Sequence, residues 1–301
     1  MNLYKITITP SSDFATTIRG DTLFGQMCWA IFYTFGKEKL STLLKRYAKE
    51  PFLVVSDAFP KCYLPKPKMP STLLGEKSEE KKQNRKKLWL ELDELIDGKY
   101  SKARTNKNIE NQDKNEMNIH NALNYKTFHT GGEGFDPYGV EVLSLASKDI
   151  YFLLDISQLD FIKFKEAFAL LSNMGYGKKA TIGKGRFEYN EENIKEIKID
   201  NTSKRFMTLS PFSPKGLVCE NIYYEPFTRF GKFGASRAYK NAFKKPILLA
   251  DTASVVEFKK PQNHQYLGKS INGLSDVPEY ANTVHQGYSI VLPIGVSNAK
   301  L

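Results

Sequence analysis

Hydrophobic and polar residues alternate at the start of the chain and then recur at helical spacing. Residues 3–9 follow a period of two, which predicts a strand. Asp21 precedes a run in which apolar residues return every three or four positions, so we expect it to be the N-cap of a helix. The apolar stripe of this helix consists of Leu23, Phe24, Met27, Cys28, Ala30, Ile31 and Phe35. A second helix is expected at about 37–49 and a short strand at 52–55.

The pattern is lost in the following hundred residues. Four prolines between 60 and 70 interrupt regular elements. Residues 76–116 carry eleven Lys or Arg and ten Asp or Glu with few apolar residues, so 98–116 are expected to be mobile in isolation. One amphipathic helix is expected from the apolar residues Leu88, Leu92, Leu95 and Ile96. We interpret about 57–150 as an insertion between core elements.

A hairpin is expected at the ordered end of this insertion, at about 120–146, around Gly131-Gly132-Glu133-Gly134. The core pattern resumes with an apolar strand at 151–156 and a helix that ends near Gly175. The buried stripe of that helix is Phe161, Phe164, Phe168 and Leu171. A glycine-rich loop and a strand at 186–189 follow. The order β-α-α-β, insertion, β-α-loop-β is close to the split βαβ, or ferredoxin-like, plan.

From about residue 201 the chain is expected to form a second αβ unit with a weaker pattern. Its clearest strands are Ile222–Glu225, Ile247–Leu249, Ser254–Phe258 and Tyr288–Ile294. At roughly 100–200 residues per domain, we therefore divide the chain into an N-terminal domain at 1–200 and a C-terminal domain at 201–301.

The composition predicts a protein of a reducing compartment. Cys28, Cys62 and Cys219 lie far apart and form neither a C-x-x-C pair nor a disulfide framework, so we expect the cytoplasm. The sequence contains no run of about 18 apolar residues, and its start lacks the basic and apolar parts of a signal peptide. No membrane contact is therefore expected.

The positive charge is concentrated in two segments. Residues 175–187 contain four Lys or Arg and no acid, an excess of four. Residues 201–246 contain nine Lys or Arg against Glu220 and Glu225, an excess of seven. Together these excesses equal the net charge of +11 of the whole chain. A local excess of this kind is typical of a protein that binds a polyanion, although a generally basic, solubilising surface is the alternative.

The stronger candidate site is the glycine-rich loop at 175–187. Its glycines permit positive φ and a close approach of backbone to ligand, and exposed N–H groups in such a loop bind anions. The expected RNA contacts in the loop are Gly175, Gly177, Lys178, Lys179, Thr181, Gly183, Lys184, Gly185 and Arg186. The spacing is not that of a Walker A loop, and the loop leaves a helix and enters a strand, unlike a Rossmann fingerprint. A flexible helix-to-strand connection is the alternative.

A second candidate segment, residues 225–237, interleaves aromatic and basic residues. Arg229, Lys232 and Arg237 could hold phosphates while the phenylalanines stack on bases, at about 1–3 kcal/mol per base. Equally, Phe227, Phe230 and Phe233 could be core residues whose basic neighbours only face solvent. Both interpretations stay open at this point.

The sequence shows no catalytic constellation. His120, His129, His264 and His285 form no H-x-x-x-H or H-E-x-x-H pair, so we expect neither a metal site, nor a cofactor, nor a catalytic residue. His120 and Asn121 could contact RNA or be structural. A metal-free ribonuclease needs only one His, Tyr or Lys near the scissile phosphate, so that class stays open.

The loop has the form G-h-G-x-K-x-x-x-G-x-G-R-F, which resembles the signature of the RAMP superfamily of CRISPR proteins. Three further segments resemble a narrower group, the Csm-four subunits of type III-A (Csm) effector complexes. They are residues 19–25 (Arg-Gly-Asp-Thr-Leu-Phe-Gly), His120-Asn121, and 284–290 (Val-His-Gln-Gly-Tyr-Ser-Ile). One departure is Lys178, which stands where the family often has a second glycine.

The resemblance implies an α+β fold of two ferredoxin-like (RRM-like) domains in tandem with an inserted thumb hairpin. It implies a non-catalytic subunit that holds the 5′ handle of the crRNA, with Arg19, His120 and Asn121 among the RNA contacts. The expected partners are the crRNA, the large polymerase-like subunit and the backbone RAMP subunit. Sequence readout in an RNA-guided complex is delegated to base pairing, so the protein has to fix the guide's shape and end.

Two other functions stay open. A metal-independent RAMP endoribonuclease would process the crRNA precursor, although such enzymes usually carry the glycine-rich loop near the C-terminus. A scaffold that binds only proteins would show no affinity for RNA.

Overall fold

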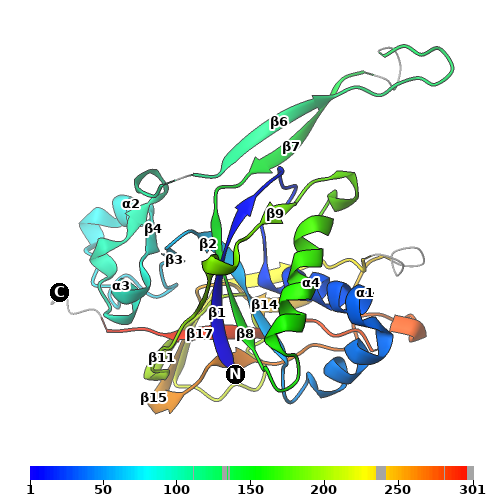
Figure 1. Ribbon diagram of the computed structural model, residues 1–301. Helices are drawn as coiled ribbons and strands as arrows, with labels where there is room; N and C mark the ends of the chain where they lie inside the picture. The colour runs from blue at the N-terminus through cyan, green and yellow to red at the C-terminus, as the bar shows by residue number, and fades with distance from the viewer. Residues whose placement is uncertain (111, 131–133, 135, 235–241, 281, 297–301) are drawn as a thin grey trace.

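Two five-stranded antiparallel sheets carry most of the fold in this computed structural model (Figure 1). The structure describes residues 1–110, 112–130, 134, 136–234, 242–280 and 282–296. Apolar residues of the first sheet and of one face of the second join one large hydrophobic cluster, which runs from Leu3 in the first strand to Ile294 after the last, and the other face of the second sheet forms a smaller cluster around Phe206 and Val256. No helix among the described residues is long and apolar enough to cross a membrane.

The first sheet has the strand order β10-β1-β8-β2, and β9 pairs with the end of β1. Its strands are β1 (Asn2–Pro10), β2 (Leu53–Pro60), β8 (Lys148–Leu154), β9 (Phe187–Glu188) and β10 (Ile194–Glu196). All seven residues of the inner strand β8 are buried, whereas β1 alternates between buried and partly exposed positions as its sequence predicts. The strand β2 extends to Pro60, so the insertion does not begin at 57, because Asp57 and its neighbours are part of the core sheet.

Two helices lie together beside this sheet (Figure 1). Helix α1 (Gly20–Arg46) breaks at Gly36, where φ is 85°, so the two expected helices are continuous except at that residue. The expected N-cap, Asp21, is wrong. Arg19 occupies the N-cap position, and the Asp21 side chain is buried in the protein. Helix α4 (Phe161–Met174) begins after Asp160, whose side chain accepts a hydrogen bond from the Lys163 N–H, and ends at Gly175.

The insertion folds into a small unit of its own. Its three-stranded sheet is made of β3 (Leu64–Pro65), β4 (Lys87–Leu90) and β5 (Arg104–Thr105), with the short helices α2 (Lys81–Asn84) and α3 (Leu92–Ile96). The expected helix through Leu88 and Ile96 is wrong, because Leu88 lies in a strand and only the second half is helical. In this unit Tyr100 and Ile109 are buried, while the expected mobility of 98–116 in isolation stays a prediction.

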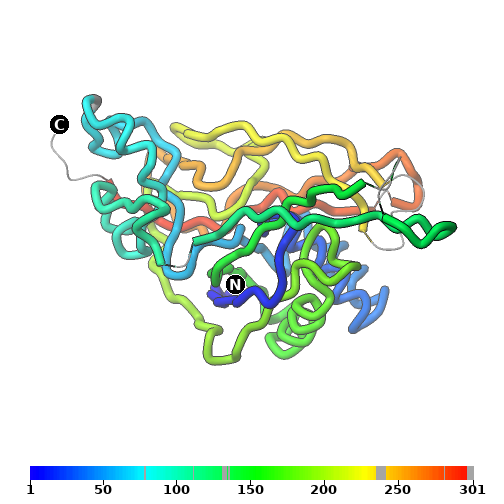
Figure 2. The backbone as a smooth tube through the Cα atoms, turned by 90° about the horizontal axis from the view of Figure 1, so that it is seen from above, coloured from blue at the N-terminus to red at the C-terminus, as the bar shows by residue number. Residues whose placement is uncertain are grey.

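The hairpin projects from the body of the molecule (Figures 1 and 2). Strand β6 (Lys114–His120) pairs with β7 (Tyr138–Ser144), and His120 lies opposite Tyr138. The hairpin begins before the expected residue 120, because β6 is exposed over almost its whole length and lacks the alternation that marks a strand. The expected turn residues 131–133 lie outside the described residues.

The second sheet has the order β12-β15-β11-β17-β16. Its strands are β11 (Thr202–Thr208), β12 (Asn221–Tyr223), β15 (Val255–Asn263), β16 (Tyr266–Gly268) and β17 (Tyr288–Pro293). Strands β13 (Pro226–Arg229) and β14 (Ile247–Ala250) form a separate pair. The central strand β11 escaped the sequence analysis, because its first half is polar and its register shifts between Ser203 and Arg205. In the described residues after Met174, the helical elements are short 3₁₀ turns.

The two large sheets, which we call the first and second units, pack on each other at a bulge in β2. Strand β2 is at the edge of the first sheet and its register with β8 shifts between Val55 and Ala58, so its outward backbone groups need partners from outside the sheet. The buried amide of Gln286 supplies two of them: its Oε1 accepts from the Val55 N–H at 2.9 Å, and its Nε2 donates to the Val55 carbonyl at 2.7 Å. The helix start must also approach closely, because a Cβ at Gly20 would lie 2.3 Å from the Val55 oxygen.

Replacing Gln286 by Ala should therefore lower the free energy of unfolding by about 2–5 kcal/mol, because two buried backbone groups each lose a partner worth about 1–3 kcal/mol. Denaturant unfolding followed by circular dichroism measures the change. The matched control is Gln83→Ala on the exposed face of α2, which should change stability by less than about 0.5 kcal/mol. Equal losses for the two variants would show that Gln286 does not support the bulge.

Candidate nucleic-acid interface

The glycine-rich loop is closed onto itself by its glycines. Gly175 ends α4 with φ of 86°, and a Cβ there would lie 2.5 Å from the Lys184 carbonyl oxygen. A Cβ at Gly185 would lie 2.1 Å from the Tyr176 carbonyl oxygen. Between these two points, the Tyr176 N–H donates to the Gly185 carbonyl at 2.8 Å. The loop conformation is therefore dictated by close backbone contact, which other residues at these positions would prevent.

The segment after β1 fixes the loop from outside. The Gly185 N–H donates to the Asp13 carbonyl at 2.8 Å, and the Arg186 N–H donates to the Ser12 hydroxyl at 2.9 Å. The Lys184 ammonium group pairs with the Asp13 carboxylate at 2.7 Å. The Lys184 charge is thus already neutralised within the chain.

Tyr176 joins the loop to the start of α1. Its side chain is 2% exposed, its hydroxyl accepts from the Arg19 N–H at 2.9 Å, and the same hydroxyl donates to the Thr17 carbonyl at 3.2 Å. Burial raises the pKa of Tyr176. The ring packs on Phe14, and Phe14 exchanges two backbone hydrogen bonds with Leu143 in β7. Residues 11–19 therefore connect the loop, the root of the hairpin and α1, a role that no sequence signal indicated.

Three cations of the loop stay available to a ligand. Across the part of the chain that the structure describes, no acidic group lies within 4.0 Å of Lys178, Lys179 or Arg186, and their side chains make no hydrogen bond. Lys178 and Arg186 are exposed, and Lys179 adopts a left-handed conformation with φ of 65°. Thr181 is exposed beside them. The loop thus presents three positive charges on a fixed backbone, which suits a phosphodiester chain.

Arg19 lies next to this surface and is only partly engaged. Its Nη1 contacts the carboxylates of Asp57 at 2.9 Å and Asp251 at 3.1 Å, and the Thr252 hydroxyl at 3.4 Å. Its Nε and Nη2 groups have no partner among the described residues, and 31% of the side chain is exposed. Arg19 can therefore donate further hydrogen bonds while its Nη1 stays bound to Asp57 and Asp251.

Arg229, by contrast, uses its Nε and Nη2 donors for a contact within the protein. Its Nε and Nη2 both bind the buried Asp21 carboxylate at 2.6 Å. Phe227 lies between the two arginines, with the Arg19 guanidinium 5.2 Å and the Arg229 guanidinium 4.8 Å from the ring centre. Cation–π contacts of this kind hold the ring in place and leave little of it for a nucleobase.

Residues 225–234, the described part of this segment, contain both buried and exposed aromatic side chains, and RNA contact by the exposed ones stays a prediction. Phe233 is buried against Tyr280, as a core residue would be. Phe230 is 72% exposed, and the Lys232 ammonium lies 4.6 Å from the centre of the Phe243 ring. Arg237, the remaining expected contact, lies outside the described residues.

The pKa values of the buried carboxylates Asp21 and Asp57 are shifted in opposite directions. Burial would raise the pKa of Asp21, but the contacts with His285, at 3.3 Å, and with Arg229 outweigh it and hold the pKa far below its usual range. Burial does raise the pKa of Asp57, and the Arg19 contact offsets only part of the effect. Asp21 is therefore the stronger anion at the contact between the two units.

His120 and Asn121 lie on the hairpin rather than at the loop. His120 stacks on Tyr138 with ring centres 5.7 Å apart, and both His120 and Asn121 are exposed. Tyr138 lies five residues from Leu143 at the hairpin root, roughly 17 Å along the strand at about 3.4 Å per residue. The expected RNA contacts therefore lie on two surfaces, the glycine-rich loop and the hairpin. Phe14 connects them, because it contacts Tyr176 in the loop and Leu143 at the base of the hairpin.

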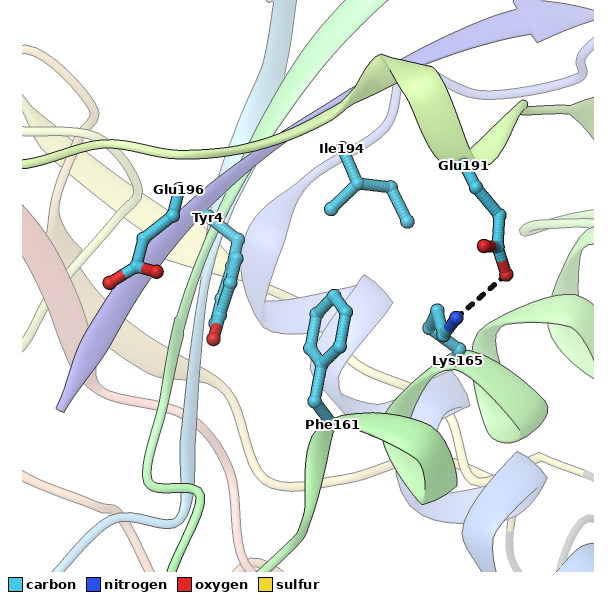
Figure 3. Close-up of a pocket in the computed structure, with 6 residues that line it drawn as sticks. All are labelled: Tyr4, Phe161, Lys165, Glu191, Ile194 and Glu196. Atoms are coloured by element: carbon cyan, nitrogen blue, oxygen red, sulfur yellow. Dashed lines mark hydrogen bonds and ion pairs between the residues drawn. The ribbon is translucent and has the colours of Figure 1, made fainter.

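A small pocket lies at the other end of α4 (Figure 3). It is lined by Tyr4, Phe161, Lys165, Glu191, Ile194 and Glu196. The Tyr4 and Phe161 rings stack at 4.7 Å, and Lys165 pairs with Glu191 at 2.6 Å. Helix α4 separates this pocket from the loop by about 20 Å, at 1.5 Å per residue, and none of the expected contacts lines it. Among the described residues, no three His, Cys, Asp or Glu side chains are grouped to hold a metal ion.

Comparison with known proteins identifies the fold. A sequence model of the RAMP superfamily matches residues 10–188, more than half of the chain. A chain of the crystal structure of the Csm1-Csm4 cassette in complex with cA4 superimposes with a TM-score of 0.61 at 17% identity, over 98% of this chain and 99% of that one. A chain of the Csm3-Csm4 subcomplex of the type III-A CRISPR-Cas interference complex gives 0.59 at 16% identity, over 98% and 100%. A search of curated proteins finds no match.

Replacing Asp21 by Asn should cost about 3–5 kcal/mol of stability at pH 7, because it leaves Arg229 and His285 without their buried anion. The pKa of Asp21 is lower in the folded than in the unfolded chain, so its contribution is present above the unfolded value of about 3.9 and is lost as the pH falls. The difference between the original chain and Asp21→Asn should therefore shrink on acidification. Denaturant unfolding between pH 7 and 3 measures it.

Asp57→Asn is the matched control, because its effect on stability should change with pH in the opposite direction. The folded-state pKa of Asp57 is raised, so protonation stabilises the folded state, and the stability of the original chain relative to Asp57→Asn should rise as the pH falls. Parallel pH profiles for the two variants would contradict the opposite charging of the two carboxylates.

Proposed function

The chain belongs to the RAMP superfamily, and from that premise we propose that it is a crRNA-binding subunit of a type III-A (Csm) CRISPR interference complex. In this role it holds the 5′ handle of the guide RNA and has no catalytic step of its own. The likeness to chains from the Csm1-Csm4 and Csm3-Csm4 assemblies supports the assignment, because it extends over 98% of this chain. By the same likeness, the partners are the large polymerase-like subunit and the backbone RAMP subunit.

The observation that carries the proposal is the state of the glycine-rich loop. Its backbone is fixed by Tyr176 and Asp13, and its side chains at 178, 179 and 186 have no acidic partner among the described residues. Because the backbone that carries these cations is already fixed, ordering the loop adds little to the entropy cost of binding an anion, and the remaining cost is that of the side chains. A sugar-phosphate strand is the ligand that matches several such charges in a row.

Arg19 and the hairpin extend this surface. The free Nε and Nη2 groups of Arg19 can form a two-pronged contact with one phosphate, for which the guanidinium geometry is suited. The hairpin presents the stacked pair of His120 and Tyr138, and aromatic faces of this kind stack on splayed single-stranded bases. The loop is therefore proposed to hold the backbone of the handle and the hairpin to contact its bases.

Binding fits the loop better than cleavage does. A metal-free ribonuclease needs an acid or base within hydrogen-bond reach of the scissile phosphate. The Tyr176 hydroxyl is buried and engaged with Thr17, and the Lys184 ammonium is paired with Asp13. The groups of the loop without a partner among the described residues are the cations of Lys178, Lys179 and Arg186, which can stabilise a bound phosphate, and no His or Tyr side chain of the loop lies free beside them.

Replacing Lys178, Lys179 and Arg186 by Ala should weaken binding of repeat-derived handle RNA and flatten its salt dependence. Each lost phosphate contact lowers the slope of log K against log salt by about 0.7, so three contacts lower it by about 2. Fluorescence anisotropy with the labelled RNA at several salt concentrations measures the slope.

The matched control replaces three exposed lysines by Ala: Lys37 and Lys45 in the second half of α1, and Lys49 just after it, none of which has an ion-pair partner among the described residues. It removes the same charge and should leave the slope unchanged. If both triple variants flatten the slope equally, general charge rather than the loop holds the RNA.

Lys184 should act through the shape of the loop rather than through a phosphate contact. Lys184→Ala and Asp13→Asn should weaken RNA binding by a similar factor, and the double variant should be no weaker than either single one, because both remove the same ion pair. The salt slope should stay unchanged. Tighter binding in Asp13→Asn would instead mean that Lys184 is released to contact RNA.

A further inference from the structure

The insertion has balanced charge in its sequence but not on its surface. Its eleven cations and ten acids nearly cancel between residues 76 and 116. In the structure, however, half of the acids are already paired. These ion pairs are Glu76 with Lys66, Glu91 and Glu94 with Arg104, Asp97 with Lys99, and Asp113 with Lys148.

The cations around α2 have no such partners. Lys81, Lys82, Arg85 and Lys86 are exposed, and in the described part of the chain no carboxylate lies within 4.0 Å of them. Residues 77–87 hold six Lys or Arg against Glu79 and Glu80. We call the four exposed residues the α2 basic patch.

The backbone under this patch is anchored. Asn84, at the end of α2, is buried, and its carbonyl accepts from the Lys66 ammonium at 2.7 Å. Lys66 is held in turn by Glu76 at 2.8 Å. Strand β4, which follows the patch, is paired on both edges by β3 and β5. The four cations therefore project from a fixed turn rather than from a loose segment.

The composition of the patch favours phosphates over a protein surface. Lysine is depleted in protein–protein interfaces, where aromatic residues and arginine are enriched. The patch has three lysines and one arginine within six residues and contains no aromatic residue. Closely spaced lysines act as point charges toward a polyanion, and each phosphate they neutralise releases counterions.

The patch lies away from the glycine-rich loop, on the opposite side of the hairpin root (Figures 1 and 2). We propose that the α2 basic patch binds the sugar-phosphate backbone of a second stretch of single-stranded RNA, outside the part held by the loop. The identity of the polyanion as RNA rests on the proposed function. The binding is independent of base sequence, because exposed lysines contact phosphates rather than base edges.

The test uses the full chain and two labelled RNAs: the repeat-derived handle alone, and the handle extended by about 20 uridines, longer than the ~4–16 nucleotides that one OB-fold, a common single-strand-binding module, covers. The patch variant replaces Lys81, Lys82 and Lys86 by Gln. It should lower the salt slope for the extended RNA by about 2, at about 0.7 per contact, and leave the slope for the handle alone unchanged.

The matched control replaces Lys37, Lys45 and Lys49 by Gln and should change neither slope. Circular dichroism of both variants confirms that they fold. Equal effects of the patch and control variants on the extended RNA would overturn the proposal, and so would an equal effect of the patch variant on both RNAs. Crosslinking of 4-thiouridine in the extension should recover the peptide that contains Lys86, and its absence from the crosslinks counts against the patch.

Two further outcomes distinguish a failure of the α2 basic patch from a failure of the handle site in the loop. If the variant at 178, 179 and 186 leaves handle binding unchanged while the patch variant still affects the extended RNA, the handle site fails and the patch stands. If the patch variant binds both RNAs normally but is lost from the assembled effector complex, the patch contacts an acidic protein surface and the RNA proposal is wrong.

Discussion

Buried backbone groups at the bulge of β2 must find partners outside their own sheet, and the arrangement of the two units follows from how they do. A bulged edge strand leaves N–H and carbonyl groups without ladder bonds, and burying them unpaired costs about 1–3 kcal/mol each. The amide of Gln286 binds both polar groups of Val55, and the Asp57 N–H donates to the Leu209 carbonyl at 2.8 Å. Both sets of polar contacts depend on how the second sheet lies against β2, so they favour the geometry that the shared apolar core stabilises.

This contact also explains the segments that carry the family resemblance. Residues 19–25 and 284–290 are far apart in sequence, yet they meet at the bulge through the contact of Asp21 with His285 and through Gln286. Gly20 allows the close approach to Val55. These motifs therefore specify how the two units dock, and Arg19 alone among them keeps hydrogen-bond donors free at the surface. Because the Tyr176 hydroxyl binds the Arg19 N–H, the docking geometry also sets the position of the glycine-rich loop.

The sequence predicted what depends on local pattern. The period-two strands, the stripe of α4 and the end of that helix at Gly175 all follow from neighbouring residues. The hairpin strand β6 and the strand β11 were missed or misplaced, because exposure on both faces or a bulge removes the alternation. The pairs of Lys184 with Asp13 and of Arg229 with Asp21 span 171 and 208 residues, and no local pattern encodes such partners. The loop between α4 and β9 was predicted correctly as a segment, but the division of its cations into paired and unpaired ones required the fold, and its contacts with RNA stay a prediction.

That division changes what a count of charges can say about binding. The excess of +11 was assigned entirely to two segments, yet Lys184 and Arg229 within them are neutralised by buried or half-buried carboxylates. The insertion, balanced in composition, instead carries four cations around one short helix that have no ion-pair partner among the described residues, because half of the acids between residues 76 and 116 are paired with other cations. The field outside a protein depends on the charges that have no near neighbour of opposite sign, since close pairs largely cancel beyond a Debye length of about 8–10 Å. A polyanion site is therefore better located by unpaired cations on anchored backbone than by the net charge of a segment.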